Sequence, residues 1–324
     1  GVFYQAPLYP YFLGILQFFF GETLWLVRLI QITLGALSCS LIFLIGQQLF
    51  SRQAGMISGF ILASYGPALF FDGLIEKSIL DLFLLTVILF LIFSAGGEAN
   101  RAKWLGIGAV LGLLALSREN ALILVPVVPC WIALSSAPVL RTTRLRRIGL
   151  FFAGLTLVLL PVGLRNLSVG GEFKLTTSQL GPNFFIGNNP AADGTYNSVR
   201  DIIGEPQLEG PDARRLAERA LQRSVSPGEV SSYWLGKSFE YIKTQPWDWL
   251  RLLAKKWMLL WNGREIEDSD DFYIYRQWSS LLGVLGRLNH FGLLAPLAAV
   301  GLLVSLREWR RLWLLYLMIL ALAA

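Results

Sequence analysis

Three cationic side chains, Lys77, Arg118 and Arg165, stand at the ends of long apolar segments. A charge at the edge of a lipid bilayer costs free energy unless it is paired or hydrated, so each of them is a candidate for a functional role. A guanidinium or ammonium group can bind and neutralise phosphate oxygens. The chemistry that suits these residues is therefore the binding of a phosphate or diphosphate group where a membrane meets water.

Local pairing is the alternative explanation for the charges around Lys77. Four ionisable residues cluster at one turn of the chain: Asp72, Glu76, Lys77 and Asp81. Lys77 and Asp81 are four residues apart on one expected helix face and can form an ion pair, so a structural and a functional role both stay open. Arg118 differs because its acidic neighbour, Glu119, is adjacent and adjacent residues do not face each other on a helix. Its guanidinium is expected to stay open.

The composition of the chain is that of a multi-pass membrane protein. Of its 324 residues 54% are hydrophobic and only 15% are charged, and the mean hydropathy is +0.54. A soluble domain is far less apolar. The net charge of +6 would suggest nucleic-acid binding in a soluble protein. Here the basic residues gather in short links between apolar segments, so no nucleic-acid partner is expected.

Eight apolar segments predict about eight spanning helices, since a span needs about 20 mostly apolar residues. They cover residues 24–50, 54–72, 77–95, 104–117, 120–136, 146–164, 289–306 and 309–324. One set of short links carries ten basic residues: Arg52, Arg101, Lys103, Arg141, Arg144, Arg146, Arg147, Arg307, Arg310 and Arg311. The alternating set carries only Lys77 and Arg118. The positive-inside rule therefore predicts that the first set is cytoplasmic.

The same rule places the one long polar stretch of the chain outside the cell membrane. We expect residues 1–164 to form a membrane bundle with an interfacial segment at 9–20, and residues 165–288 to form an external, periplasmic-side domain. Residues 289–324 are expected to add further spanning helices. The chain is expected to be the middle of a longer protein, because no signal peptide or first spanning helix precedes its interfacial segment.

The external domain is expected to be mostly helical with a little β structure. The alternating stretch Glu172–Thr177 could form a strand, and Gly181–Pro190 has the composition of turns. Ser226–Glu229 has the pattern of a capping box, which predicts a helix from Pro227 to about Lys243. A second helix is expected from Pro246 to about Trp261.

No cofactor or metal site is expected. The chain has no P-loop and no dinucleotide-binding glycine pattern. Its single histidine, His290, excludes a multi-histidine metal site. An external site would not meet cytosolic nucleotides, so an activated lipid is the plausible source of energy. A polyprenyl-phosphate sugar fits, because its phosphate is the leaving group that basic side chains can hold.

Five groups of motifs follow one another along the chain: Tyr4–Pro10, Leu26–Gln31 with Ile45–Phe50, Phe71–Leu80, Leu116–Pro126, and Arg165-Asn166 with Gly187–Gly194. This series resembles the bacterial membrane glycosyltransferases of family-39 type, relatives of the protein O-mannosyltransferases and of the lipid A aminoarabinose transferase. The resemblance implies an all-α, GT-C-like fold in the cell inner membrane. It also implies a polyprenyl-phosphate sugar donor and an external protein, lipid or glycan acceptor.

The resemblance assigns roles to individual residues. Lys77, Arg118 and Arg165 would bind the donor's phosphate. Further residues are candidates for the lining of a substrate cavity: Tyr4, Pro7, Tyr9, Glu76, Asn183, Asn188 and Asn189. In this family the general base is an aspartate in the first external loop, before the Pro-Leu-Tyr motif that corresponds here to Pro7–Tyr9. That base is therefore expected upstream of Gly1, and the chain by itself is expected to be inactive.

Two functions of other classes stay open. A flippase or transporter of lipid-linked saccharides should have broken helices with polar residues at the membrane midplane, whereas the ionisable residues here lie at the outer edge. A non-catalytic membrane scaffold would use residues 169–275 to bind partners, and substitutions at Lys77 and Arg118 would then have no effect.

Overall fold

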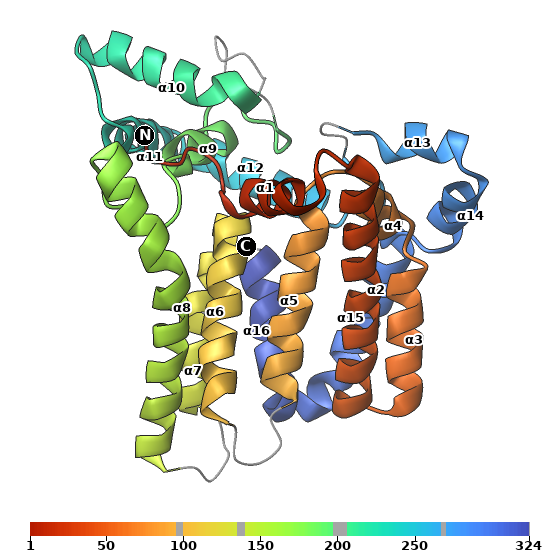
Figure 1. Ribbon diagram of the computed structural model, residues 1–324. Coiled ribbons are helices and arrows are strands. Elements are labelled where there is room, and N and C mark those ends of the chain that lie inside the picture. Colours follow the sequence, from red (N-terminus) through yellow and green to blue (C-terminus); the bar gives the residue numbers. More distant parts are fainter. Residues whose placement is uncertain (95–99, 135–139, 197–205, 267–269, 324) are drawn as a thin grey trace. The chain divides into compact units, whose positions relative to one another are not determined.

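A computed structural model describes the chain except for residues 95–99, 135–139, 197–205, 267–269 and 324 (Figure 1). The described residues form α-helices and two short 3-10 helices, and no strand occurs among them. The expected all-α class is confirmed, and the expected β structure is wrong.

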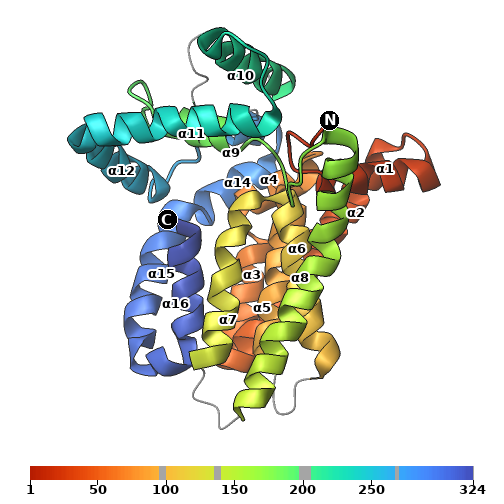
Figure 2. The same cartoon turned by 90° about the vertical axis from the view of Figure 1, so that its left-hand side faces the viewer.

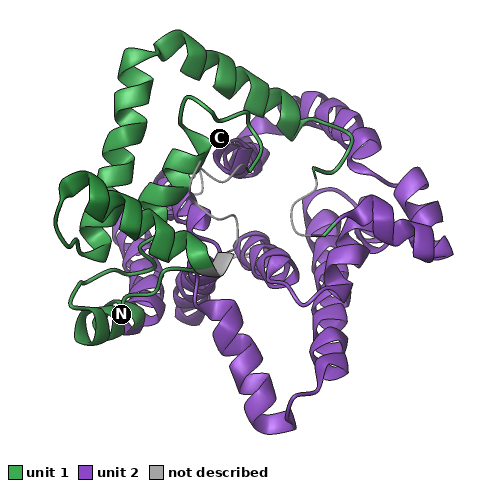
Figure 3. Ribbon diagram, turned by 90° about the horizontal axis from the view of Figure 1, so that it is seen from above, with its two compact units in different colours: residues 1–5, 162–270 green, residues 6–161, 271–324 purple. Residues whose placement is uncertain are grey.

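The chain divides into two compact units (Figure 3). Unit 1 consists of residues 1–5 and 162–270, and unit 2 consists of residues 6–161 and 271–324. The long helix α8 (Arg141–Gly170) contributes its first part to unit 2 and its last turns to unit 1. These units are defined by packing, so the expected division into membrane and external parts stays a prediction.

Unit 2 is a bundle of apolar helices. Besides the first part of α8 it contains α1 (Leu8–Phe20), α2 (Leu24–Leu49), α3 (Arg52–Ala63), α4 (Gly66–Gly73), α5 (Ser78–Phe93), α6 (Arg101–Ser117), η1 (Glu119–Ile123), α7 (Leu124–Leu134), α13 (Phe272–Trp278), α14 (Ser280–Leu288), α15 (Phe291–Ser305), η2 (Leu306–Glu308) and α16 (Trp309–Ala323). Figures 1 and 2 show α2, α3, α5 and α6 running side by side, whereas α1 lies across one end of them. This direction of α1 is the one expected of an interfacial segment.

Glycines allow α6 and α8 to pack closely. A Cβ atom on Gly108 of α6 would overlap the carbonyl of Phe151, and one on Gly154 of α8 would overlap the carbonyl of Leu105. Lipid tails are as apolar as leucine, so helices in a membrane associate through such close contacts rather than through the hydrophobic effect. The small residues therefore set how near the two backbones come.

Some of these helices are long and apolar enough to cross a membrane. By length and composition α2, α8 and the segment Ser280–Ala323 qualify, and the pair α3 and α4, bent by 54°, would make a fourth span. Only 22% of the apolar window of α2 is buried inside the protein, as expected of a helix that faces lipid. The multi-pass membrane class is confirmed, whereas the count of eight spans stays a prediction.

Unit 1 is helical as well. After the last turns of α8 it contains α9 (Leu180–Gly187), α10 (Pro206–Leu221), α11 (Pro227–Thr244) and α12 (Pro246–Leu260). One cluster of its buried core consists of Ala213, Ala217, Val225, Val230 and Trp234. The Ser226 side chain accepts a hydrogen bond from Glu229 N, and the Glu229 side chain accepts one from Ser226 N, so the predicted capping box is confirmed. The two predicted helices after it, α11 and α12, are confirmed too.

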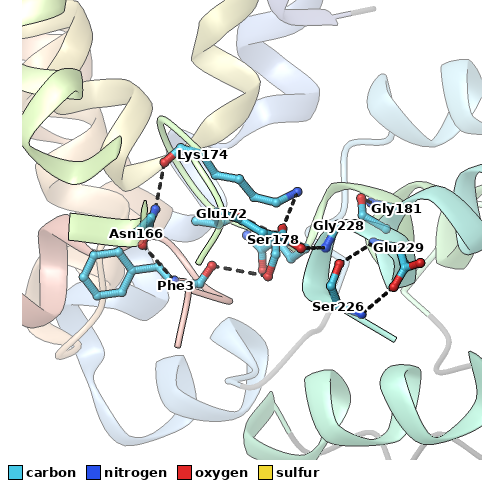
Figure 4. Close-up of polar contacts among 12 residues, drawn as sticks. Phe3, Asn166, Glu172, Lys174, Ser178, Gly181, Ser226, Gly228 and Glu229 are labelled. Carbon is cyan, nitrogen blue, oxygen red and sulfur yellow. Dashed lines mark hydrogen bonds and ion pairs between the residues drawn. The ribbon is translucent and has the colours of Figure 1, made fainter. Parts of the chain in front are cut away.

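The expected strand at Glu172–Thr177 is irregular instead (Figure 4). The side-chain amide of Asn166 of α8 donates to the carbonyls of Lys174 and Thr176 at 2.8 and 3.0 Å. These carbonyls therefore bond to a side chain and not to the backbone of a neighbouring strand. Glu172 accepts from Gly228 N at 3.0 Å. Alternation along the segment reflects packing on α8, because Phe173 and Leu175 both lie against Gly163.

The segment Gly181–Pro190, expected to be turns, instead begins with helix α9. Gly181 N donates to Ser231 Oγ of α11 at 3.0 Å, and a Cβ at Gly181 would overlap the Ser231 backbone. Packing against α11 therefore stabilises a helix in a sequence whose composition favours turns.

Candidate phosphate-binding site

Lys77 and Arg118, far apart in sequence, meet at one corner of unit 2. Lys77 directly precedes α5, and Arg118 directly follows α6. Lys77 Nζ donates to the carbonyl oxygen of Ser117 at 3.2 Å, so the ammonium group lies at the backbone of the residue before Arg118. The carbonyls at the end of a helix are unsatisfied and carry partial negative charge, which favours a cation there.

Arg118 is held by a carboxylate of the neighbouring helix. Its Nε donates to Asp81 Oδ2 at 2.8 Å, and the side chains of the two residues are 51% and 10% exposed. The ion pair between Lys77 and Asp81, considered as an alternative, is wrong, because Asp81 pairs with Arg118. The expectation that the Arg118 guanidinium stays open is therefore wrong at its Nε edge, which Asp81 holds. Within the described part of the chain, the two terminal nitrogens of the guanidinium bond to nothing and form an open fork.

Two further polar atoms at this corner are buried. Asp81 Oδ1 and Ser117 Oγ have no hydrogen-bond partner among the described residues. Ser117 is completely buried, and Asp81 is 8% exposed. Buried polar groups are normally hydrogen-bonded, so these two atoms could bond to a ligand that binds at this corner.

The turn before Lys77 is fixed by side chains of α2. Arg28 Nε donates to Gly73 O at 3.1 Å, and Gln31 Nε2 donates to Leu74 O at 2.6 Å. Gln31 in turn accepts from the Tyr9 hydroxyl at 3.0 Å. Sequence reasoning missed Arg28 and Gln31, although two polar residues three apart in an apolar segment share one helix face and were a usable signal.

Two further cavity candidates of unit 2 are Glu76, which is adjacent to Lys77, and Pro7. Glu76 accepts a hydrogen bond from Ser78 Oγ at 3.1 Å, which fixes its carboxylate at the start of α5. Pro7 is buried and directly precedes α1, the helix that carries Tyr9. Asp72 lies against Gly35 of α2, where a Cβ atom would overlap its carboxylate.

Arg165 belongs to unit 1, so its membership of the same phosphate site stays a prediction. Its Nη1 donates to Gly1 O at 2.6 Å and to Asn166 Oδ1 at 3.3 Å, and its guanidinium carbon lies 4.0 Å from the centre of the Phe3 ring. Asn166, completely buried, accepts from Phe3 N at 3.1 Å (Figure 4). Both residues therefore hold the segment that leads to Tyr4 and the Pro-Leu-Tyr motif.

The asparagines expected at the cavity differ in their surroundings. Asn183 is exposed. Asn188 and Asn189 are buried, and their amides donate to carbonyls of the last turn of α9 at 2.8 to 3.0 Å. The Asn188 carbonyl oxygen also accepts from Trp249 Nε1 at 3.1 Å. These contacts are those of residues that end a helix.

Tyr4 lies beside a buried carboxylate. Its ring packs on Gly210, and both the Tyr4 hydroxyl and Glu209 Oε1 are buried without a hydrogen-bond partner among the described residues. Burial raises the pKa of the Glu209 carboxyl above its ordinary value, and burial and the nearby Glu209 raise the pKa of Tyr4. Both groups are therefore favoured in their neutral forms.

The described residues contain no group of three or more His, Cys, Asp or Glu side chains that could hold a metal ion. Lys77 and Arg118 lie at a corner where Asp81 pairs with one edge of the Arg118 guanidinium and the remaining N–H donors of both cations are unused by the described residues. Such a corner can bind an anionic group with several oxygen acceptors.

Comparison with known proteins gives one match. The sequence profile of the family described as dolichyl-phosphate-mannose-protein mannosyltransferase matches residues 4–163. No curated protein and no solved structure shows a significant match to the chain. The matched segment, about half of the chain, includes the corner formed by Lys77 and Arg118. The chain therefore belongs, through residues 4–163, to the dolichyl-phosphate-mannose-protein mannosyltransferase family of GT-C type and is a glycosyltransferase.

Proposed function

We propose that this membrane glycosyltransferase moves a sugar from a polyprenyl-phosphate donor to an external protein, lipid or glycan acceptor, and that Lys77 and Arg118 bind the donor's phosphate. The meeting of these two cations at one corner of unit 2 supports the proposal best. The Lys77 ammonium lies 3.2 Å from the carbonyl oxygen of the residue that precedes Arg118.

The chemistry of the leaving group explains why two cations are useful. Breaking the bond between sugar and phosphate leaves negative charge on the departing phosphate. Cations that interact more strongly with this charge in the transition state than in the ground state accelerate the reaction. Ser117 O and Asp81 already hold the two side chains, so little reorganisation is needed when the donor binds. An acceptor hydroxyl also needs a general base, which the family resemblance assigns to an aspartate of the first external loop.

Arg165 is proposed as a further ligand of the phosphate. Its Nη1 group is engaged, whereas its Nη2 and Nε groups bond to nothing within the described residues. Part of its fork is therefore available to an anion.

Neither alternative function gains support. The family match identifies an enzyme. The bend between α3 and α4 resembles the broken helices of transporters, but Asn289 Nδ2 donates there to Ile61 O at 2.7 Å and to Ser64 Oγ at 2.9 Å. The freed backbone is thus satisfied by a protein side chain.

Substitution of the two cations tests the proposal. Arg118→Ala and Lys77→Ala should each lower turnover about 30- to 1,000-fold, because a charged hydrogen bond to the developing phosphate is worth about 2–4 kcal/mol. Arg118→Lys keeps the charge but loses the fork, so its activity should lie between those of wild type and Arg118→Ala. The measurement is transfer of labelled sugar from a polyprenyl-phosphate donor by the full-length protein.

Arg52→Ala is the matched control, since Arg52 is an exposed arginine at the start of α3 and belongs to the predicted cytoplasmic set. Its activity should equal that of the wild type. Normal turnover in both Arg118→Ala and Lys77→Ala, with unchanged expression, would show that the two cations are structural.

A further inference from the structure

A cavity lined by a cationic side chain lies in unit 2 between α7 and α16. It has a volume of about 360 Å³ and is lined by Leu134, Trp309, Arg310 and Trp313. Leu134 ends α7, and the other three residues stand in the first turns of α16. A volume of this size can hold the phosphate and glycerol of a lipid headgroup but not a whole lipid.

Among the described residues that line this cavity, the polar side-chain groups are all hydrogen-bond donors. Arg310 contributes a guanidinium, and Trp309 and Trp313 contribute indole N–H groups. The Arg310 guanidinium carbon lies 5.8 Å from the centre of the Trp309 ring. Across the described ranges, neither Arg310 nor the two indole nitrogens has a hydrogen-bond acceptor or an ion-pair partner.

Glu308, the acidic residue nearest to Arg310 in the sequence, does not neutralise it. Glu308 pairs with Arg311 at 3.1 Å, and Arg311 also donates to Gln48 O of α2 at 3.1 Å. The charge of Arg310 is therefore available to a ligand. Trp309 is 55% exposed and Leu134 is 67% exposed, so large apolar surfaces adjoin the cation.

We propose that this cavity binds an anionic phospholipid of the surrounding bilayer, with the lipid phosphate on Arg310 and the acyl chains along the outer surface of α7 and α16. Charge complementarity supports this occupant, because the described residues that line the cavity offer donors and positive charge and include no acidic side chain. Its place at the ends of two apolar helices, among the basic residues of the predicted cytoplasmic set, is where anionic headgroups are found. Tryptophan and arginine side chains each combine an apolar part with a polar end, which suits them to the boundary between lipid headgroups and acyl chains.

Lipid titrations of the purified full-length protein in neutral detergent test the site. The thermal unfolding midpoint is followed as phosphatidylglycerol, phosphatidylcholine or inorganic phosphate is added. Phosphatidylglycerol should raise the midpoint and the other two should not. In Arg310→Gln the half-saturating concentration of phosphatidylglycerol should rise about tenfold, the size expected for loss of one charged hydrogen bond.

Arg307→Gln is the matched control, because it removes the same charge from the same end of the bundle, outside the cavity. It should leave the half-saturating concentration unchanged. Trp313→Phe keeps an aromatic ring but loses the indole N–H, and it should weaken binding a few-fold. Equal effects of Arg310→Gln and Arg307→Gln would show attraction by overall charge and overturn the site. A midpoint raised equally by phosphatidylcholine or by inorganic phosphate would overturn the choice of lipid.

Discussion

Asp81 is the residue that orients Arg118 in the proposed phosphate site. Its Oδ2 accepts from Arg118 Nε at 2.8 Å, so the outer edge of the guanidinium keeps a defined direction. Asp81→Ala should lower kcat/KM about tenfold, because the fork is then free to rotate and an ordered charged hydrogen bond is lost. Steady-state kinetics of sugar transfer, with the donor varied, measure this change.

A double variant separates positioning from general destabilisation. If Asp81 acts through Arg118, Asp81→Ala should cause no further loss of activity in an Arg118→Ala background, since coupled residues are not additive. Additive losses in the two variants would contradict the positioning role.

Glu209 should make the stability of unit 1 depend on pH. Burial raises the pKa of its carboxyl above the ordinary value of 4.5. A raised pKa means that protonation favours the folded state. The stabilisation of the folded state by protonated Glu209 is therefore complete below the ordinary pKa. It is lost as the pH rises through the raised pKa that Glu209 has in the folded state. Glu209→Gln should stabilise α10 at neutral pH and remove this dependence. Amide hydrogen exchange of α10, corrected for the intrinsic effect of pH, measures it. Identical exchange in both proteins at pH 7 would exclude the effect.

At the scale of elements, the contact between α6 and α8 depends on glycine. A Cβ at Gly154 would overlap the Leu105 carbonyl, whereas one at Gly149 of the same helix would meet nothing within 4 Å. Gly154→Ala should destabilise the protein by about 1–3 kcal/mol through overpacking. Gly149→Ala should be neutral or stabilising, because alanine favours a helix over glycine by about 1 kcal/mol. Thermal unfolding of both variants in detergent gives the comparison. Equal midpoints would show that α6 and α8 do not approach so closely.

At the scale of the whole molecule, the prediction concerns the side of the membrane on which each part lies. The asymmetry of basic residues predicts that Ser232 of α11 is external and Thr142 at the start of α8 is cytoplasmic. Both are exposed. After replacement of Cys39 and Cys130 by serine, an impermeant thiol reagent applied to intact cells should label Ser232→Cys and not Thr142→Cys. The opposite pattern would reverse the orientation and place Lys77 and Arg118 inside.

Several features could be predicted from the sequence because their causes are local. Apolar segments of sufficient length predict membrane helices wherever they occur. The capping box at Ser226 and Glu229 and the two helices after it depend on neighbours within a few residues. The order of the five motif groups along the chain was enough to identify the glycosyltransferase family and to select Lys77 and Arg118 as candidate phosphate-binding residues.

Other features were decided only by tertiary structure, because they depend on which distant segments pack together. Asp81 could pair with Lys77 by spacing alone, but the packing of α5 on α6 brings Arg118 to it instead. The alternating pattern after Glu172 predicts a strand and carries no information about Asn166. In the structure the Asn166 amide donates to two carbonyls of this segment, which a neighbouring strand would otherwise bond. A side chain bonds to the partner that the fold brings within about 3 Å, and sequence spacing limits that choice only within one helix or turn.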